Sequence, residues 1–135
     1  MRHALNAVVL LAAVATGCSG APRDWQATRT TEGGAYKVTV EPGLDPIAIN
    51  RIHEWTLHVE TADGRVVENA KIVVDGGMPE HQHGLPTRPE VTEYLGDGDY
   101  LVEGMKFNMT GFWELQVSIE AGGVRDVATF ELVLP

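Results

Sequence analysis

The fold is decided near the C-terminus, where residues 113–134 read WELQVSIEAGGVRDVATFELVL. Apolar and polar residues alternate on both sides of the pair Gly122-Gly123. A period of two places successive side chains on opposite faces of an extended strand, so each half presents one apolar face. Two glycines between such halves fit a tight hairpin turn. This stretch therefore predicts two antiparallel strands that share a buried face.

The same alternation recurs earlier in the chain, in the segments 36–41 and 54–60. Across these segments and the hairpin, the residues expected to face the core are Tyr36, Val38, Val40, Trp55, Leu57, Val59, Trp113, Leu115, Val117, Ile119, Ala128, Phe130, Leu132 and Leu134. Shorter strands are expected at residues 71–75, 91–95 and 100–102, and no segment has the spacing of an amphipathic helix. About seven strands with regular turns predict an all-β fold, an immunoglobulin-like antiparallel β-sandwich.

One break in parity predicts a local irregularity. Tyr100 and Val102 share a face, whereas Met105 and Phe107 fall on the opposite parity. Gly104 lies between the two pairs. An extra residue in one strand shifts the parity of everything after it, so we expect a bulge or bend at Gly104.

The N-terminus has the pattern of an export signal. A short basic opening precedes residues 4–15, which are apolar apart from Asn6. This run is shorter than the roughly 20 residues that span a bilayer, so it indicates a secretory signal. The following residues, Ala15-Thr16-Gly17-Cys18, resemble the bacterial lipobox, in which the cysteine is acylated. The alternative is ordinary cleavage nearby, with Cys18 left as a free thiol.

These features divide the chain into three parts. Residues 1–17 are interpreted as a lipoprotein signal peptide, residues 18–34 as a flexible polar tether after lipidated Cys18, and residues 35–135 as one domain. The expected location is therefore the cell envelope, in the periplasm or elsewhere outside the cytoplasm. The lipid would anchor the protein to a membrane, which is thus one expected partner.

Charge and motifs exclude several function classes. The chain has 10 Lys and Arg against 19 Asp and Glu, a net charge of -9. Such a surface repels phosphate backbones, so nucleic acid is not an expected partner. No serine lies in a nucleophile-elbow motif, and the only cysteine is the expected anchor, so we do not expect an enzyme.

The residues that indicate a binding function lie between Gly76 and Pro89, a segment expected to be a loop because glycine and proline frame it. His81, His83 and Met78 fall within it. Loops on rigid scaffolds often carry function.

A second cluster follows the expected bend, where Met105, Phe107 and Met109 would share a face in an extended chain. Thioether ligands favour Cu(I), and imidazole accepts Cu(I), Cu(II) or Zn(II). The predicted site therefore binds copper through His81 and His83, with Met78, Met105 or Met109 completing the ligand set. The alternatives are that the methionines only pack beneath the loop, and that the loop contacts a protein partner without metal, through Leu85 and Phe112.

Two other patterns are set aside. His53 and His58 suggest a zinc-protease motif, but their odd spacing in an alternating strand places them on opposite faces, with His58 exposed and His53 at the strand end. Residues 96–99 suggest a calcium loop but lack its remaining oxygen ligands, so an acidic turn is expected.

The order of these motifs resembles the YtkA-like domain family, which is related to the FixH-like proteins. The most specific part is the string MPEHQHGL at residues 78–85, followed by Gly98-Asp99-Tyr100, residues 102–107 and Gly111-Phe112-Trp113. The resemblance covers about residues 36–134 and implies a β-sandwich on the outer side of the cytoplasmic membrane. FixH-like relatives are linked to copper delivery and oxidase assembly, which implies a copper-accepting or copper-donating envelope protein as partner. They carry a transmembrane helix, whereas this chain is expected to carry a lipid.

Overall fold

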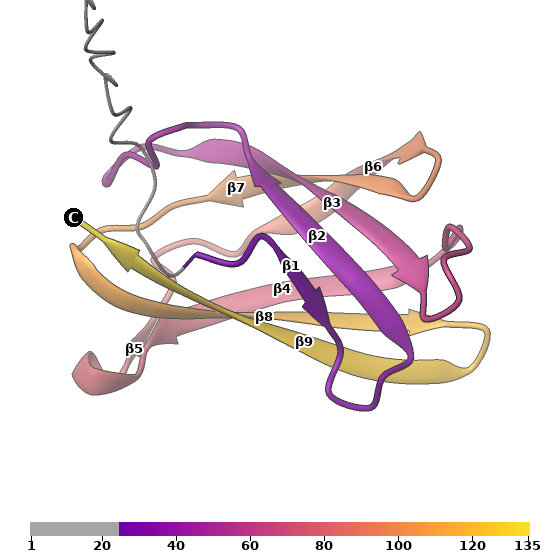
Figure 1. Cartoon of the computed structure of the whole chain (residues 1–135). Helices are drawn as coiled ribbons and strands as arrows, with labels where there is room; N and C mark the ends of the chain where they lie inside the picture. The colour runs from indigo at the N-terminus through magenta and orange to yellow at the C-terminus, as the bar shows by residue number, and fades with distance from the viewer. Residues whose placement is uncertain (1–24) are drawn as a thin grey trace, which may run out of the picture.

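The computed structural model describes residues 25–135, which form two antiparallel sheets that face each other (Figure 1). The expected signal peptide and Cys18 lie outside the described residues. The elements in chain order are β1 (Thr28–Thr30), β2 (Tyr36–Pro42), β3 (His53–Thr61), β4 (Lys71–Met78), the short 3₁₀ helix η1 (Pro79–His81), β5 (His83–Gly84), β6 (Glu90–Gly96), β7 (Asp99–Met105), β8 (Gly111–Ala121) and β9 (Val124–Leu134). No helix within residues 25–135 has the length and apolar character needed to cross a membrane.

The strand order confirms the immunoglobulin-like sandwich. One sheet has the order β1-β2-β3-β7-β6 and the other β5-β4-β8-β9. In the constant-type immunoglobulin fold, one sheet has the strand order A-B-E-D and the other has the order C-F-G, lettered in chain order. The strands β2-β3-β7-β6 and β4-β8-β9 take these positions in the same chain order. The short strands β1 and β5 are additions at the edges, which is why the sequence pattern predicted fewer strands.

The core consists of the inward faces of both sheets. Every alternating residue predicted to face the core is buried, from Tyr36 on β2 to Leu134 on β9. The hairpin around Gly122-Gly123 also forms as predicted, since Ala121 pairs with Val124. Removing this apolar surface from water is the main source of stability, at roughly 25 cal/mol per Å².

The predicted irregularity at Gly104 is a β-bulge. Trp55 on β3 pairs with Val102 on β7, but His53 pairs with Met105, so the step of two residues on β3 faces a step of three on β7. Gly104 has a φ of 84°, a conformation that glycine adopts without strain. The extra residue turns the side chain of Met105 back into the core, where it is fully buried.

The predicted tether, residues 18–34, is wrong over its second half. Thr28–Thr30 form β1 along the free edge of β2, and Thr31 is buried. The Trp25 ring lies 5.8 Å from that of Trp55 in an edge-to-face contact. The β-branched threonines suit an edge strand, and a tryptophan gains much by burying its ring. The folded domain therefore includes residues from Trp25 onward.

Asp126 of β9 holds the turn between β1 and β2 through hydrogen bonds to its backbone. Its carboxylate accepts hydrogen bonds from the backbone N–H groups of Gly33 at 2.9 Å and Ala35 at 3.0 Å. Hydrogen bonds from the Thr31 hydroxyl and from these N–H groups hold the pKa of Asp126 far below its ordinary value. The folded state therefore favours the charged carboxylate.

Replacing Asp126 with asparagine is expected to lower the melting temperature at neutral pH, because an amide cannot offer two acceptor oxygens to these N–H groups. Because the pKa of Asp126 is lower in the folded state, its carboxylate stabilises the fold at pH values above the pKa that it has in the unfolded chain. That contribution is lost as the pH falls below about 4. The difference between wild type and Asp126→Asn should therefore shrink in acid, measured by circular dichroism melting. The matched control is Glu131→Gln on the exposed face of β9, and an Asp126→Asn deficit that is independent of pH would contradict this account.

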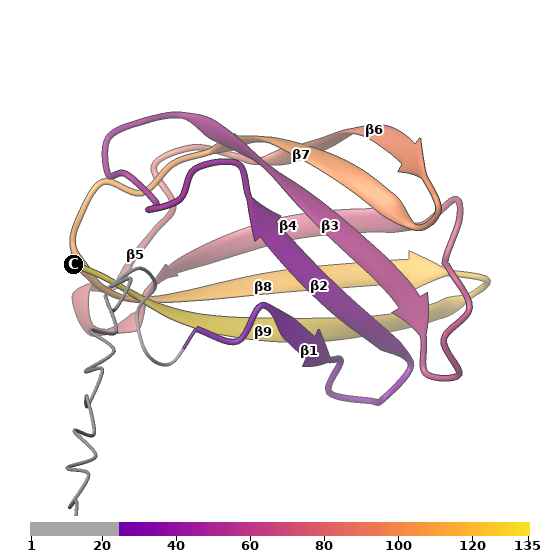
Figure 2. The ribbon, with the colours of Figure 1, turned by 45° about the horizontal axis from the view of Figure 1, so that its top comes forward.

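Three connections gather at one end of the sandwich, where β2, β4, β7 and β9 end (Figures 1 and 2). They are the β2–β3 loop, the segment with η1 and β5, and the β7–β8 loop. All of the predicted metal ligands lie in these connections or in the last residues of the strands that enter them. The fold thus brings together residues that are far apart in the sequence.

Candidate functional site

The segment predicted to be a loop from Gly76 is partly a strand. Gly76, Gly77 and Met78 complete β4, where Gly76 pairs with Leu115 of β8. The chain then makes the single turn of η1, and Gln82 takes a left-handed conformation with a φ of 53°. This reversal lets β5 pair back onto β4, with His83 opposite Met78. The expectation of an irregular segment failed here because β8 supplies the hydrogen-bonding partner that local sequence does not reveal.

His83 lies at the centre of the candidate site. Its Nε2 is 3.3 Å from the sulfur of Met109, and its Nδ1 is 3.1 Å from the carbonyl oxygen of Gly84. When the ring carries its proton on Nδ1, that N–H donates to the carbonyl and the Nε2 lone pair faces the sulfur. Histidines that bind metals are usually oriented in this way, through a hydrogen bond from the other nitrogen.

His81 is close enough to join His83 on one ion. The centres of the two rings are 6.0 Å apart, and the His81 side chain is exposed. Two imidazoles that bind one ion at about 2 Å place their ring centres no more than roughly 6 Å apart. The turn of η1 and the left-handed Gln82 produce this spacing. The structure thus brings together the two histidines that the sequence singled out.

The three methionines lie in different surroundings. Met78 is buried at the end of β4, where its methyl group packs over Gly111. Met109 is 37% exposed and contacts His83. Met105 is fully buried on β7 and pairs with His53 of β3, its neighbour in the five-stranded sheet. The prediction that Met105 and Met109 share a face is wrong, because the regular strand ends at Met105 and the chain turns before Met109.

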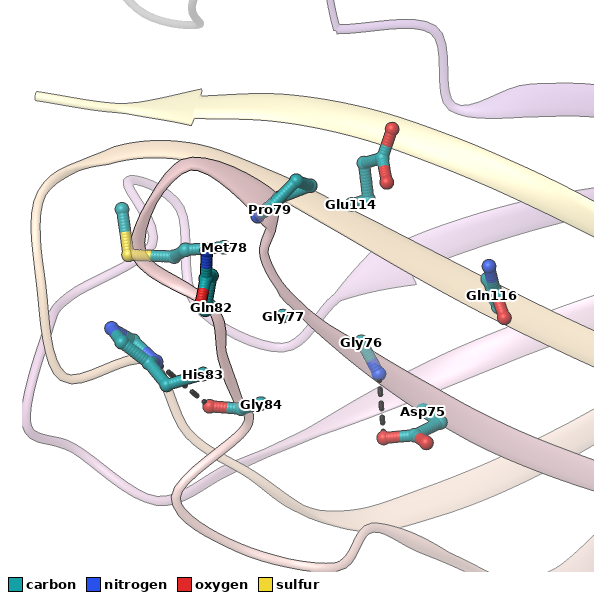
Figure 3. A pocket seen from close by; sticks show the side chains of 10 residues that line it. All are labelled: Asp75, Gly76, Gly77, Met78, Pro79, Gln82, His83, Gly84, Glu114 and Gln116. Atoms are coloured by element: carbon teal, nitrogen blue, oxygen red, sulfur yellow. Dashed lines mark hydrogen bonds between the residues drawn. The ribbon is translucent and has the colours of Figure 1, made fainter.

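Met78 and His83 also border a shallow pocket of about 260 Å³ between β4, β5 and the start of β8 (Figure 3). In Figure 3 the Met78 thioether and the His83 imidazole lie at the same end of this pocket. Asp75 and Glu114 line its other parts, so its rim is acidic. Within residues 25–135, no group of three or more His, Cys, Asp or Glu side chains has the arrangement of a metal site. The donors that lie beside His83 include the His81 imidazole and the Met109 thioether.

Trp113 supports the site and was not identified from the sequence as part of it. Its ring is fully buried and lies 5.7 Å from the His83 ring, at an interplanar angle of 71°. Its indole Nε1–H donates to the carbonyl oxygen of Met109 at 3.1 Å. One side chain therefore contacts His83 and fixes the backbone of Met109. Alternation identified Trp113 as a core residue, but it gave no sign of this hydrogen bond.

The other two histidines within residues 25–135, His53 and His58, do not form a joint site, as predicted. His53 and His58 lie on opposite faces of β3, with His53 buried and His58 on the outer face. The Nδ1 of His58 is 2.6 Å from the Asp99 carboxylate, and this contact raises the pKa of His58. His58 therefore belongs to a partly exposed ion pair across β3 and β7. Asp97 and Gly98 form the turn between β6 and β7 that was expected in place of a calcium loop.

Comparison with known protein families identifies a match over most of the described residues. The family model described as YtkA-like matches residues 30–118, which is most of the region that the structure describes. The matched range contains η1, β5, the β7–β8 loop and Trp113. No curated protein and no solved structure matches the chain.

Proposed function

The chain belongs to the YtkA-like family, and from this premise and the geometry of the site we propose that it is an extracytoplasmic module that binds copper at one end of the sandwich. His81 and His83 supply imidazole ligands, and Met109 supplies a thioether, with Met78 as a further sulfur beside them. The observation that carries the proposal is the 3.3 Å approach of His83 Nε2 to the Met109 sulfur. A borderline nitrogen next to a soft sulfur suits Cu(I) better than it suits hard cations.

The exposed position of this end supports a role in capture or transfer of the ion. Ile52 on the β2–β3 loop is 67% exposed and Ile49 is 37% exposed, next to the loops that carry the ligands. A partner protein that donates or accepts copper could pack against these two isoleucines beside the ion. Binding, rather than catalysis, is the proposed role.

Copper binding is tested by a Cu(I) competition titration against a chromophoric chelator, with residues 19–135 kept under reducing conditions. We expect the double variant His81→Ala/His83→Ala to lose a bound Cu(I) ion that the wild type holds, because two of its nitrogen donors are gone. The matched control is His58→Ala, which removes an imidazole on the outer face of β3 and should leave binding unchanged. Equal binding by wild type and double variant would sink the copper proposal and leave an interaction module that works without metal.

Lipid attachment at Cys18 is the second part of the proposal, and it rests on the export signal and the lipobox-like residues. The full chain expressed in a bacterial host should sediment with membranes, whereas Cys18→Ala should be recovered in the soluble fraction. Equal partitioning of the two chains would show that Cys18 does not carry the anchor.

A further inference from the structure

Besides His81 and His83, His53 is a third histidine with features of a metal ligand. It is the first residue of β3 and is only 9% exposed. Its Nδ1 lies 3.1 Å from the carbonyl oxygen of Arg51, while its Nε2 is buried without a hydrogen-bond partner. An unpaired polar atom in the interior is costly, so such an atom requires an explanation. With the proton on Nδ1, the buried nitrogen presents a lone pair to the interior.

The surroundings of His53 combine aromatic rings with one sulfur. The ring of Phe107 lies 6.0 Å from that of His53, and the ring of Trp55 lies 6.3 Å away. Met105 is the register partner of His53 across β3 and β7, and both side chains point into the core. Directly opposed residues have Cβ atoms about 4.5–5.5 Å apart, which is within reach of an imidazole and a thioether. The register therefore places the His53 imidazole and the Met105 thioether within reach of each other.

His53 and His83 share the same local arrangement. In each, Nδ1 lies 3.1 Å from a backbone carbonyl oxygen, which leaves Nε2 on the side away from the backbone. For His83 that nitrogen faces Met109, whereas for His53 it lies inside the core next to the strand of Met105. We propose that His53 Nε2 and the Met105 sulfur form a second, interior site for a soft monovalent metal ion.

The choice of ion rests on the proposed copper function, and the chemistry of the interior supports it. Thioether ligands select Cu(I), and the aromatic rings around His53 exclude water. A cation close to the face of a tryptophan is also attracted by the ring, and Trp55 is the available partner. Burial lowers the pKa of His53, so its Nε2 stays unprotonated and able to bind an ion at neutral pH.

Aromatic side chains connect the interior site to the surface site. Phe107 lies between His53 and Trp113, with 5.1 Å between the Phe107 and Trp113 rings, and Trp113 contacts His83. The β2–β3 loop covers the other side, where the N–H of Asn50 donates to the carbonyl oxygen of Phe107 at 2.7 Å.

A buried water molecule is the competing account of the same atoms. Trp55 Nε1 is also buried without a partner, so one water could accept from Trp55 and donate to His53. If a water molecule occupies this position, an added metal ion should not affect His53. If the position is a metal site, the ion should bind to His53 Nε2. The two accounts therefore differ in what silver, a redox-inert probe for Cu(I), does to His53.

The test is a titration of residues 19–135, labelled with ¹⁵N-histidine, with Ag(I), observed by NMR at the imidazole nitrogens. We expect the Nε2 resonance of His53 to shift on addition of silver, both in the wild type and in His81→Ala/His83→Ala. Met105→Leu removes the sulfur with little change in volume and should abolish the shift. His53→Gln should lose the same bound ion, and His58→Gln is the control.

The outcomes separate this inference from the copper proposal. Silver that shifts His83 but leaves His53 unchanged overturns the interior site and keeps the surface site. A shift of His53 in the double variant establishes the interior site even if the surface histidines do not bind. A shift of His53 that persists in Met105→Leu removes Met105 from the ligand set and overturns the proposed pair.

Discussion

Trp113→Ala is expected to lower the free energy of unfolding by about 3–5 kcal/mol, the cost of truncating a buried tryptophan in a packed core. The Trp113 ring is fully buried between the sheets and contacts Phe107 edge to face. Its removal leaves a cavity at the end of the sandwich that carries the site, and the carbonyl oxygen of Met109 loses its donor. Denaturant unfolding followed by circular dichroism measures this loss, provided that the slope with denaturant stays unchanged.

A second substitution separates packing from positioning. Trp113→Phe keeps an aromatic ring but lacks the N–H that fixes Met109, so we expect a smaller loss of stability together with weaker metal binding. Loss of a group that orients a metal ligand typically reduces affinity by about 10- to 100-fold. Phe130→Ala, in the core beside Trp25, is the matched control, since it creates a cavity without contacting His83 or Met109. If Phe130→Ala weakened Cu(I) binding as much as Trp113→Phe, general loosening of the fold would explain both.

The sheets were predictable because alternation reports burial directly. A residue such as Val38 or Leu115 is apolar between polar neighbours, and only one face of an antiparallel sheet in this sandwich meets the core. The bulge was predictable for the same reason, since an extra residue at Gly104 leaves a visible shift of parity. His81 and His83 could be singled out because their separation along the chain is short.

The parts that sequence analysis missed depend on contacts between distant segments. β1 is a three-residue strand that exists because the edge of β2 is free, and the Thr-rich segment alone resembles a linker. His53 was identified as a strand-end residue, but its burial depends on Phe107 and on the β2–β3 loop that covers it. The approach of Met109 to His83 needs the β7–β8 loop beside β5. Such contacts leave no periodic trace in the sequence.

Gly77→Ala is expected to displace β5 and to weaken metal binding. A Cβ atom at Gly77 would lie 2.5 Å from the carbonyl oxygen of His83 and 3.1 Å from the Cα of Gly84. Both are backbone atoms of the paired strand, so neither can move aside without moving β5. Overpacking of this kind costs about 1–3 kcal/mol, and here the strand that must shift carries His83. The contact between His83 Nε2 and the Met109 sulfur should therefore be lost with it.

Gly84→Ala provides the matched control on the opposite strand. A Cβ atom at Gly84 would lie 3.4 Å from the carbonyl oxygen of Gly76, which is an ordinary contact, and Gly84 is exposed. Stability should then change by no more than about 0.5 kcal/mol, and Cu(I) affinity should stay close to that of the wild type. Thermal melts and Cu(I) competition on both variants check the pair. If Gly77→Ala bound copper as tightly as Gly84→Ala, His83 would not need its observed position, and β5 would not be part of the site.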